Sequence, residues 1–167
     1  MQLQHHNTSF KKQEHSIILI CDSVNSPANM GGLLRLADSF GVQKVIFGGI
    51  PVDLKSPRLK RTARSTQNWI PVEDNVNLET YIPELKKEGY TIVALEITNN
   101  SKAINEQTFL KDSKIALVIG DESAGVSQTV LEQSHIQNHI TMFGENSSMN
   151  VTQATAVALY EITKQIQ

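Results

Sequence analysis

Residues 17–49 read IILICDSVNSPANMGGLLRLADSFGVQKVIFGG, and this stretch decides the fold class. It opens with a continuous apolar run from Ile17 to Cys21, which is typical of a strand covered on both faces. Apolar residues then recur at helical spacing, which predicts a helix. Its expected N-cap is Asn29, and its expected C-terminal residue in the left-handed conformation is Gly41. A second strand over Lys44–Phe47 completes a βαβ unit, which predicts two parallel strands joined by a helix.

The rest of the sequence continues this alternation of strand-like runs and helix-like periods. Further strands are predicted at Thr91–Ile97, Lys114–Ile119 and His139–Phe143, and further helices at Leu78–Lys87, Ser127–Gln133 and Asn150–Gln167. The segment from Pro51 to Pro71 has weak periodicity and is assigned no regular element. We therefore predict one α/β domain over residues 16–167, a mostly parallel sheet flanked by helices, with residues 1–15 as a flexible N-terminal tail.

Composition is typical of a soluble globular protein. Apolar residues make up 40% of the 167 residues and charged residues 19%, which excludes a disordered or fibrous chain. The longest apolar runs reach about five residues, far below the ~20 that span a bilayer, and no signal segment opens the sequence, so we expect a cytoplasmic protein. The single cysteine, Cys21, excludes internal disulfides and a cysteine-based zinc site.

Unusual residues follow three of the predicted strands. Asn29, Gly31, Gly32 and Arg35 follow the first, whereas GDESAG at 120–125 and GENSSMN at 144–150 follow two later ones. Each group alone has a structural explanation, as a helix cap or a turn, and Arg35 alone is consistent with a solvated side chain. Ligands of open α/β sheets bind beyond the carboxyl ends of the strands, so three such groups in one sheet predict a site there.

Several common catalytic and binding motifs are absent from the sequence. It contains neither G-x-x-x-x-G-K-[ST] nor G-x-G-x-x-G, which bind phosphates, and no G-x-S-x-G nucleophile elbow. It also contains no H-E-x-x-H and no cysteine cluster, so we predict no metal site. These absences count against one alternative, a small-molecule α/β enzyme that uses a nucleotide.

A basic segment lies between the second and third predicted strands. Five of the chain's 15 Lys and Arg residues fall within ten positions with no acid between them: Lys55, Arg58, Lys60, Arg61 and Arg64. Such a run is usually a solvated face. In a chain of net charge −2, however, a nucleic-acid partner requires a local patch, and this concentration fits a contact with an RNA phosphate backbone. Trp69 follows the segment and fits either a base-stacking or a core role.

The three strand-end groups resemble the three motifs of the SpoU (TrmH-like) RNA 2′-O-ribose methyltransferases. NMGGLLRLA at 29–37 with FGV at 40–42 is similar to the first motif, and LVIGDE at 117–122 with Gly125 to the second. ITM at 140–142 with Gly144, followed by SMNV at 148–151 and ALYE at 158–161, is similar to the third. The resemblance covers about residues 17 to 165, with the motifs in the same order and at similar spacing.

This resemblance implies a fold and an activity. Members of the family bind S-adenosylmethionine in a deep trefoil knot formed by the C-terminal strands and helix. They work as homodimers through the knot region and methylate a ribose 2′-hydroxyl of RNA. Unknotted chains are the rule among proteins, so the knot is expected from the resemblance alone.

The resemblance also implies roles for individual residues. Arg35 matches the arginine that helps to deprotonate the ribose hydroxyl, Asn29 the asparagine that orients this arginine or the substrate, and Glu122 a glutamate that gives structural or electrostatic support. Ser148 and Asn150 match a pair near the active site. The expected cofactor pocket is lined by Leu95, Gly120, Ile140, Met142 and Ser148. Glycines in such a pocket let the backbone approach the adenine and ribose.

The chain departs from the family pattern at three positions. Thr141 replaces a proline, Asp121 replaces an asparagine, and Gln153 stands in a stretch that is normally small and apolar. None of these changes removes a group that the chemistry needs.

The resemblance also bears on the substrate. The sequence lacks the N-terminal RNA-binding domain of rRNA-modifying relatives, and RST at 64–66 with WIPV at 69–72 resembles enzymes that methylate the D-loop guanosine of tRNA. We therefore predict a tRNA 2′-O-methyltransferase. An rRNA 2′-O-methyltransferase and a catalytically idle RNA-binding module on the same fold are the alternatives.

Overall fold

The computed structural model describes residues 10–167, so most of the predicted tail over residues 1–15 lies outside the described residues. Residues 10–14 form no helix or strand, and the first strand begins at His15. From that point one sheet organises the chain.

The described residues form a seven-stranded sheet in the order β3-β2-β1-β6-β4-β7-β5. Its strands are β1 (His15–Asp22), β2 (Val42–Gly48), β3 (Val72–Val76), β4 (Thr91–Leu95), β5 (Lys102–Ala103), β6 (Ile115–Gly120) and β7 (Ile136–His139). Every paired strand runs parallel to its neighbour. The predicted α/β class with a mostly parallel sheet is therefore confirmed.

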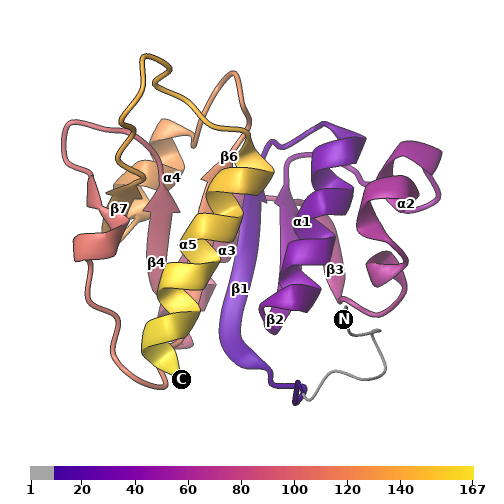
Figure 1. Ribbon diagram of the computed structural model, residues 1–167, viewed down its shortest axis with the longest axis horizontal. Coiled ribbons are helices and arrows are strands. Elements are labelled where there is room, and N and C mark those ends of the chain that lie inside the picture. The colour runs from indigo at the N-terminus through magenta and orange to yellow at the C-terminus, as the bar shows by residue number, and fades with distance from the viewer. Residues whose placement is uncertain (1–9) are drawn as a thin grey trace, which may run out of the picture.

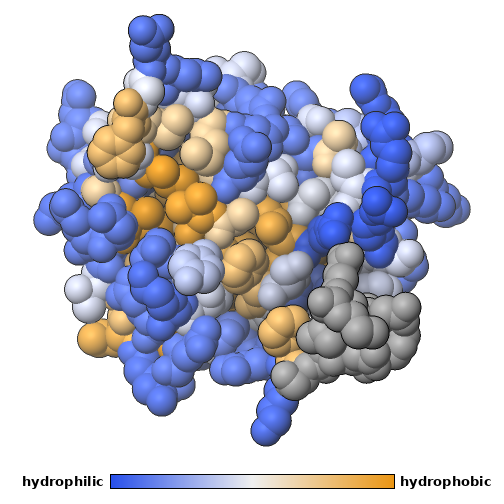
Figure 2. Space-filling view, in the orientation of Figure 1, coloured by the Kyte–Doolittle hydropathy of each residue, from blue (hydrophilic) through white to orange (hydrophobic). Residues whose placement is uncertain are grey.

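Helices cover both faces of this sheet. They are α1 (Pro27–Ser39), α2 (Pro57–Ala63), α3 (Leu78–Lys87), α4 (Gln128–Gln133) and α5 (Val151–Ile166), with short 3₁₀ turns η2 (Thr66–Asn68) and η3 (Ile104–Glu106). In Figure 1, α1 and α5 lie in front of the sheet, α3 and α4 lie behind it, and α2 lies beside α1. Figure 2 shows hydrophilic surface over α2 and exposed apolar surface beside α5.

The apolar run of β1 lies between two hydrophobic clusters because alternate side chains of a strand point to opposite faces. Ile17, Leu19 and Cys21 belong to the cluster that contains the apolar residues of α1 and α5. Ile18 and Ile20 belong to the cluster that contains those of α3 and α4. Complete burial raises the pKa of the Cys21 thiol, so this group stays neutral and serves the packing.

The predicted N-cap of α1 is wrong. The Ser26 side chain caps the helix by accepting a hydrogen bond from the Asn29 N–H, and Pro27 occupies the first helical position, where its missing N–H costs nothing. Asn29 therefore lies inside the first turn, and its side chain is not needed as the N-cap.

The predicted strand at His139–Phe143 is also wrong. The strand β7 lies earlier, at Ile136–His139, and residues 140–150 contain no helix or strand. The polar sequence IQNH gives no strand signal, whereas Ile140 and Met142 imitate one although they do not contribute to the sheet. For a similar reason the sequence did not predict β3, which is VEDNV and mostly exposed.

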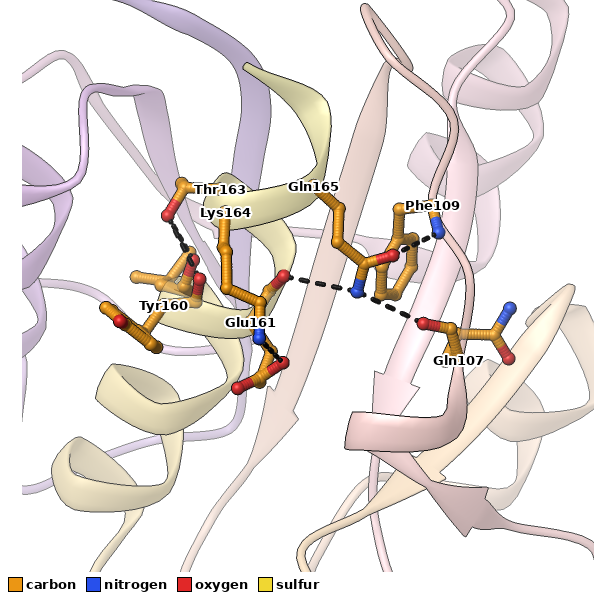
Figure 3. Close-up of polar contacts among 8 residues, drawn as sticks. Gln107, Phe109, Tyr160, Glu161, Thr163, Lys164 and Gln165 are labelled. Atoms are coloured by element: carbon orange, nitrogen blue, oxygen red, sulfur yellow. Dashed lines mark hydrogen bonds and ion pairs between the residues drawn. The ribbon is translucent and has the colours of Figure 1, made fainter.

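The C-terminal half of α5 is attached to the segment that precedes β6. The Gln165 Oε1 atom accepts a hydrogen bond from the Phe109 N–H at 2.9 Å, and its Nε2 atom donates to the Gln107 carbonyl at 3.1 Å (Figure 3). The Asp112 N–H donates to the carbonyl of Ile166. These contacts hold α5 across the front of the sheet, so its N-terminus points toward the carboxyl ends of the strands.

Candidate active site

A cavity of about 440 Å³ lies at the carboxyl ends of β4, β6 and β7. Its lining includes Leu95, Gly120, Ile140, Met142 and Ser148, which are all of the residues expected to line the cofactor pocket. Glu122 lines it as well. The cavity falls within the size range of small-molecule sites, and the carboxyl ends of parallel strands are where such ligands bind.

Three of the expected catalytic residues meet at the edge of this cavity. The side-chain amide of Asn150 donates to Asn29 Oδ1 at 3.2 Å and to Glu122 Oε1 at 2.5 Å. The Asn150 Oδ1 atom accepts the N–H of Thr152 and thereby caps α5. One side chain thus starts the last helix and joins residues from α1 and from the loop after β6.

Ser148 lines the cavity within the loop that precedes α5. Its N–H and its hydroxyl both donate to Asn146 Oδ1, at 3.2 and 3.3 Å. These two hydrogen bonds form a local turn that stabilises the loop with Ser148 at the cavity wall.

Arg35 does not line the cavity of its own chain. It lies on α1 with an exposed side chain, and among the described residues its guanidinium forms no ion pair. The structure therefore gathers Asn29, Glu122, Ser148 and Asn150 around the cavity and leaves the fifth expected catalytic residue outside it.

The loop after β6 owes its shape to two glycines. A Cβ atom at Gly120 would overlap the backbone carbonyl of Gly125 and the nitrogen of Val126, because the loop folds back directly over Gly120. Gly125 has a φ of +68°, a conformation that favours glycine, and its N–H donates to the Asp121 carbonyl at 2.8 Å. The backbone therefore forms part of the cavity wall.

Two acids that the sequence analysis did not select support this loop. Glu96, at the end of β4, accepts the N–H groups of Ile97 and Val126, each at 2.9 Å. Asp22, at the end of β1, is buried and accepts the N–H of Ser127 at 2.8 Å. The signal was available in the sequence, since Asp22 directly follows the apolar residues 17–21 and Glu96 directly follows the apolar residues 92–95.

The loop also contains an acid that stays ionised. Hydrogen bonds from the Ser123 hydroxyl and N–H hold the pKa of Asp121 below its usual value. Because Asp121 and Glu122 are adjacent on the cavity wall, the wall near the loop is acidic.

The basic segment forms α2 and its flanks. Its five basic side chains are all exposed, and among the described residues none of them is in an ion pair. The helix packs closely on α1, where a Cβ at Gly31 would overlap the Leu59 carbonyl. The first turn of α1 also contacts Asn150, through Asn29. The helix α1 therefore lies between the basic side chains of α2 and the edge of the cavity.

Trp69 is not a core residue. Its side chain is 54% exposed, and its indole N–H donates to Asp38 Oδ1 at 2.8 Å.

None of the helices described for residues 10–167 is long and apolar enough to cross a membrane. Within the same residues, no group of three or more His, Cys, Asp or Glu side chains is placed to hold a metal ion.

Comparison with known families and proteins relates this arrangement to RNA methylases. The model of the SpoU rRNA Methylase family matches residues 16–160. The chain is 30% identical over 145 residues to the 23S rRNA (guanosine(2553)-2′-O)-methyltransferase RlmP of Bacillus subtilis, covering 87% of this chain and 57% of that protein. It is 32% identical over 151 residues to the tRNA (guanosine(18)-2′-O)-methyltransferase of Saccharomyces cerevisiae, covering 89% of this chain and 10% of that one.

Solved structures agree with these relatives. The TrmH/SpoU tRNA modifying enzyme of A. aeolicus superposes with a TM-score of 0.82 at 27% identity, over 92% of this chain and 77% of that one. An AdoMet-bound rRNA methyltransferase from Sinorhizobium meliloti shares the fold, with a TM-score of 0.83 at 24% identity. The superposition covers 95% of this chain and 59% of that one. The chain spans less than two thirds of the length of the two curated relatives.

Proposed function

Since the chain belongs to the SpoU rRNA Methylase family, we propose that it transfers a methyl group from S-adenosylmethionine to a ribose 2′-hydroxyl of RNA. The observation that carries the proposal is the junction at Asn150, which joins Asn29 and Glu122 at the edge of a cavity lined by every residue expected to bind the cofactor. Such a junction places polar groups beside a small-molecule site, as a group transfer between cofactor and RNA requires.

The cavity fits S-adenosylmethionine in size and chemistry. S-adenosylmethionine supplies a methyl group activated by a sulfonium charge. Apolar walls at Leu95, Ile140 and Met142 suit its nucleoside, and the backbone of Gly120, which has no Cβ, allows close approach. The carboxylate of Glu122 favours the positive end of such a ligand.

Arg35 acts on the substrate in this proposal. A ribose hydroxyl is a very weak acid, and a guanidinium near the adjacent phosphate lowers its pKa or positions it for attack. Asn29 orients the arginine or the ribose, Asn150 joins α1 to the loop after β6, and Ser148 lines the cavity. The absence of an ion pair to Arg35 among the described residues supports this role, because the charge is free for an RNA phosphate.

The substrate that we favour is tRNA, at a D-loop guanosine, with rRNA as the alternative. The similarity to a tRNA methyltransferase and to an rRNA methyltransferase supports RNA as the partner of this chain. The exposed basic side chains of α2 and its flanks supply the local positive charge that a chain of net charge −2 needs to bind it.

A charge reversal tests the RNA contact. The double variant Arg58→Glu, Arg61→Glu is expected to weaken tRNA binding by roughly ten- to a hundredfold and to lower the salt slope by about two, since each lost phosphate contact removes about one released counterion. Fluorescence anisotropy across a salt series measures both quantities. The control is Lys87→Glu with Lys111→Glu, an equal change in charge at exposed sites on α3 and before β6.

Cofactor affinity provides the second readout for these variants. Both pairs are expected to bind S-adenosylhomocysteine like the wild type, because none of the four residues lines the cavity. Equal loss of tRNA binding in both pairs would show an effect of net charge alone and would remove α2 from the RNA interface.

The activity itself is tested with labelled S-adenosylmethionine and unmodified tRNA or rRNA, followed by mass mapping of the methylated nucleotide. A 2′-O-methyl at one tRNA position supports the proposal in full. Transfer to rRNA alone keeps the reaction and overturns the tRNA assignment. Cofactor binding without methyl transfer to either RNA overturns the proposed enzymatic activity and favours the catalytically idle RNA-binding module.

We further propose that residues 16–167 form a single methyltransferase domain with a C-terminal trefoil knot. The arrangement of the last segments supports the knot. The loop after β6 and the loop after β7 line the same cavity, and α5 then returns to pack against α1 and β6.

A homodimer through the knot region belongs to the same proposal. Val157 and Tyr160 support it, because they are 39% and 59% exposed on α5 and leave large side chains for a second copy to cover. Figure 2 shows exposed apolar surface beside the same helix. A dimer also gives Arg35 a route to a cavity other than that of its own chain. A cytoplasmic location goes with the proposal, since the RNA substrate is met there.

A further inference from the structure

His139 is a cavity residue to which the proposed reaction assigns no role. It is the last residue of β7 and lines the cavity together with Thr98. Other polar side chains on the wall are engaged locally: the Thr98 hydroxyl donates to Gln137 Oε1 at 2.7 Å, and Asp121 accepts from Ser123. Among the described residues, the Nε2 atom of His139 has no hydrogen-bond partner.

The contacts of Ser101 define the tautomer of His139. The Ser101 hydroxyl oxygen accepts the Thr98 N–H at 3.0 Å and donates its one proton to the Thr98 carbonyl at 2.9 Å. It lies 2.9 Å from His139 Nδ1. All three contacts are satisfied together only when Nδ1 carries a hydrogen and donates it to Ser101. In the neutral imidazole this tautomer leaves a free lone pair on Nε2, so that Nε2 accepts a hydrogen bond.

The surroundings select the group that this lone pair receives. Leu95 and Ile140 line the same cavity, the latter directly after His139, and both are apolar. The charged side chains of the lining are the acids Glu96, Asp121 and Glu122, which suit the ammonium group of the cofactor's methionine half. A neutral acceptor beside apolar side chains instead suits a neutral donor of the nucleoside half, such as an amino group on a flat base or a sugar hydroxyl.

We propose that His139 Nε2 accepts a hydrogen bond from a neutral donor on the nucleoside half of S-adenosylmethionine, either the adenine amino group or a ribose hydroxyl. The inference rests on the proposed function, because it needs the cavity to be the cofactor site. Ser101 is then a positioning residue, since it holds the imidazole in the accepting tautomer without touching the ligand.

Two near-isosteric variants isolate the Nε2 atom. In His139→Asn the side-chain amide reproduces Nδ1 and keeps a donor for Ser101 but leaves nothing at Nε2, whereas His139→Gln places an amide oxygen at the Nε2 position. Isothermal titration with S-adenosylhomocysteine is expected to show a Kd roughly five- to thirtyfold higher for His139→Asn than for the wild type. The His139→Gln variant is expected to stay within about threefold of the wild type.

Analogues of the ligand make the test independent of folding. The probes are S-adenosylhomocysteine with a dimethylated adenine amine, and the 2′-deoxy and 3′-deoxy forms. For the analogue that lacks the relevant donor, wild type and His139→Asn are expected to bind equally, whereas for the other analogues the wild type keeps its advantage. That pattern identifies the donor.

Two results would overturn different statements. If the wild type and His139→Asn bind S-adenosylhomocysteine with the same Kd, or if the advantage of the wild type persists with all three analogues, His139 does not accept from the nucleoside. If the wild type does not bind S-adenosylhomocysteine at all, the cavity is not the cofactor site and the proposed function itself fails.

Discussion

Replacing Arg35 by alanine is expected to lower the rate of methyl transfer by roughly a thousandfold or more, because the variant loses the charge proposed to activate the ribose hydroxyl. Affinity for S-adenosylhomocysteine is expected to stay within about twofold of the wild type, since Arg35 does not line the cavity. Stability is also expected to change little, because the side chain is exposed and has no ion pair with another described residue. Single-turnover kinetics with tRNA and isothermal titration measure the first two quantities.

The Arg35→Lys variant is the matched control for charge. It keeps the cation but loses the planar fork that binds a phosphate through two hydrogen bonds, so we expect a rate between those of the wild type and Arg35→Ala. Wild-type turnover in Arg35→Ala would remove this residue from the mechanism. A parallel loss of cofactor affinity would instead mean that Arg35 shapes the pocket.

Replacing Gly120 by alanine is expected to weaken cofactor binding by roughly ten- to a hundredfold. The added methyl group would overlap the backbone of Gly125 and Val126, which cannot rotate away as a flexible side chain can. The loop after β6 must therefore open, and with it the wall that includes Glu122. Titration with S-adenosylhomocysteine measures the loss, and thermal melting reports the strain that remains in the fold.

Gly144→Ala is the matched control for Gly120→Ala. It adds the same methyl group in another strand-end loop, but no atom lies within 4 Å of the position that its Cβ would occupy. We expect wild-type affinity and melting temperature from this variant. Equal effects of the two substitutions would contradict the close backbone packing at Gly120.

For the proposed homodimer, the two variants together decide which protomer supplies Arg35. In a co-expressed heterodimer of Arg35→Ala and Gly120→Ala, the protomer with an intact pocket has no arginine of its own, and the protomer with the arginine has a damaged pocket. We expect activity to be restored, because Arg35 does not line the cavity of its own chain and would act in the pocket of the partner. An inactive heterodimer would place the arginine and the pocket of each site in one chain.

The strands that the sequence predicted correctly are those buried on both faces. Runs such as Ile17–Cys21 and Ile115–Ile119 contain apolar residues at every position, so that either face can meet a helix layer. The strands β3, β5 and β7 are short or polar and were missed, because only their place in the sheet makes them strands. The start of α5 was predicted at Asn150, whose side chain caps the helix, whereas the local cap of α1 at Ser26 was missed.

The loop at residues 140–150 shows where local pattern misleads. Ile140 and Met142 alternate with neighbours as in a half-buried strand, but they line the cavity instead of pairing with β4. Hydrophobic periodicity records which residues avoid water and carries no information on whether a core or a ligand site covers them.

The sequence by itself determined the elements whose signal is local: the continuous apolar strands, the amphipathic helices, and the residue types gathered after three strand ends. Tertiary structure alone decided the strand order, in which β6 lies between β1 and β4, and the contact of Asn150 with Asn29, 121 positions earlier. It also decided that Arg35 lies outside the cavity of its own chain. The physical reason is that propensity and periodicity act over a few residues, whereas a site forms where parallel strands bring the ends of distant segments to one edge of the sheet.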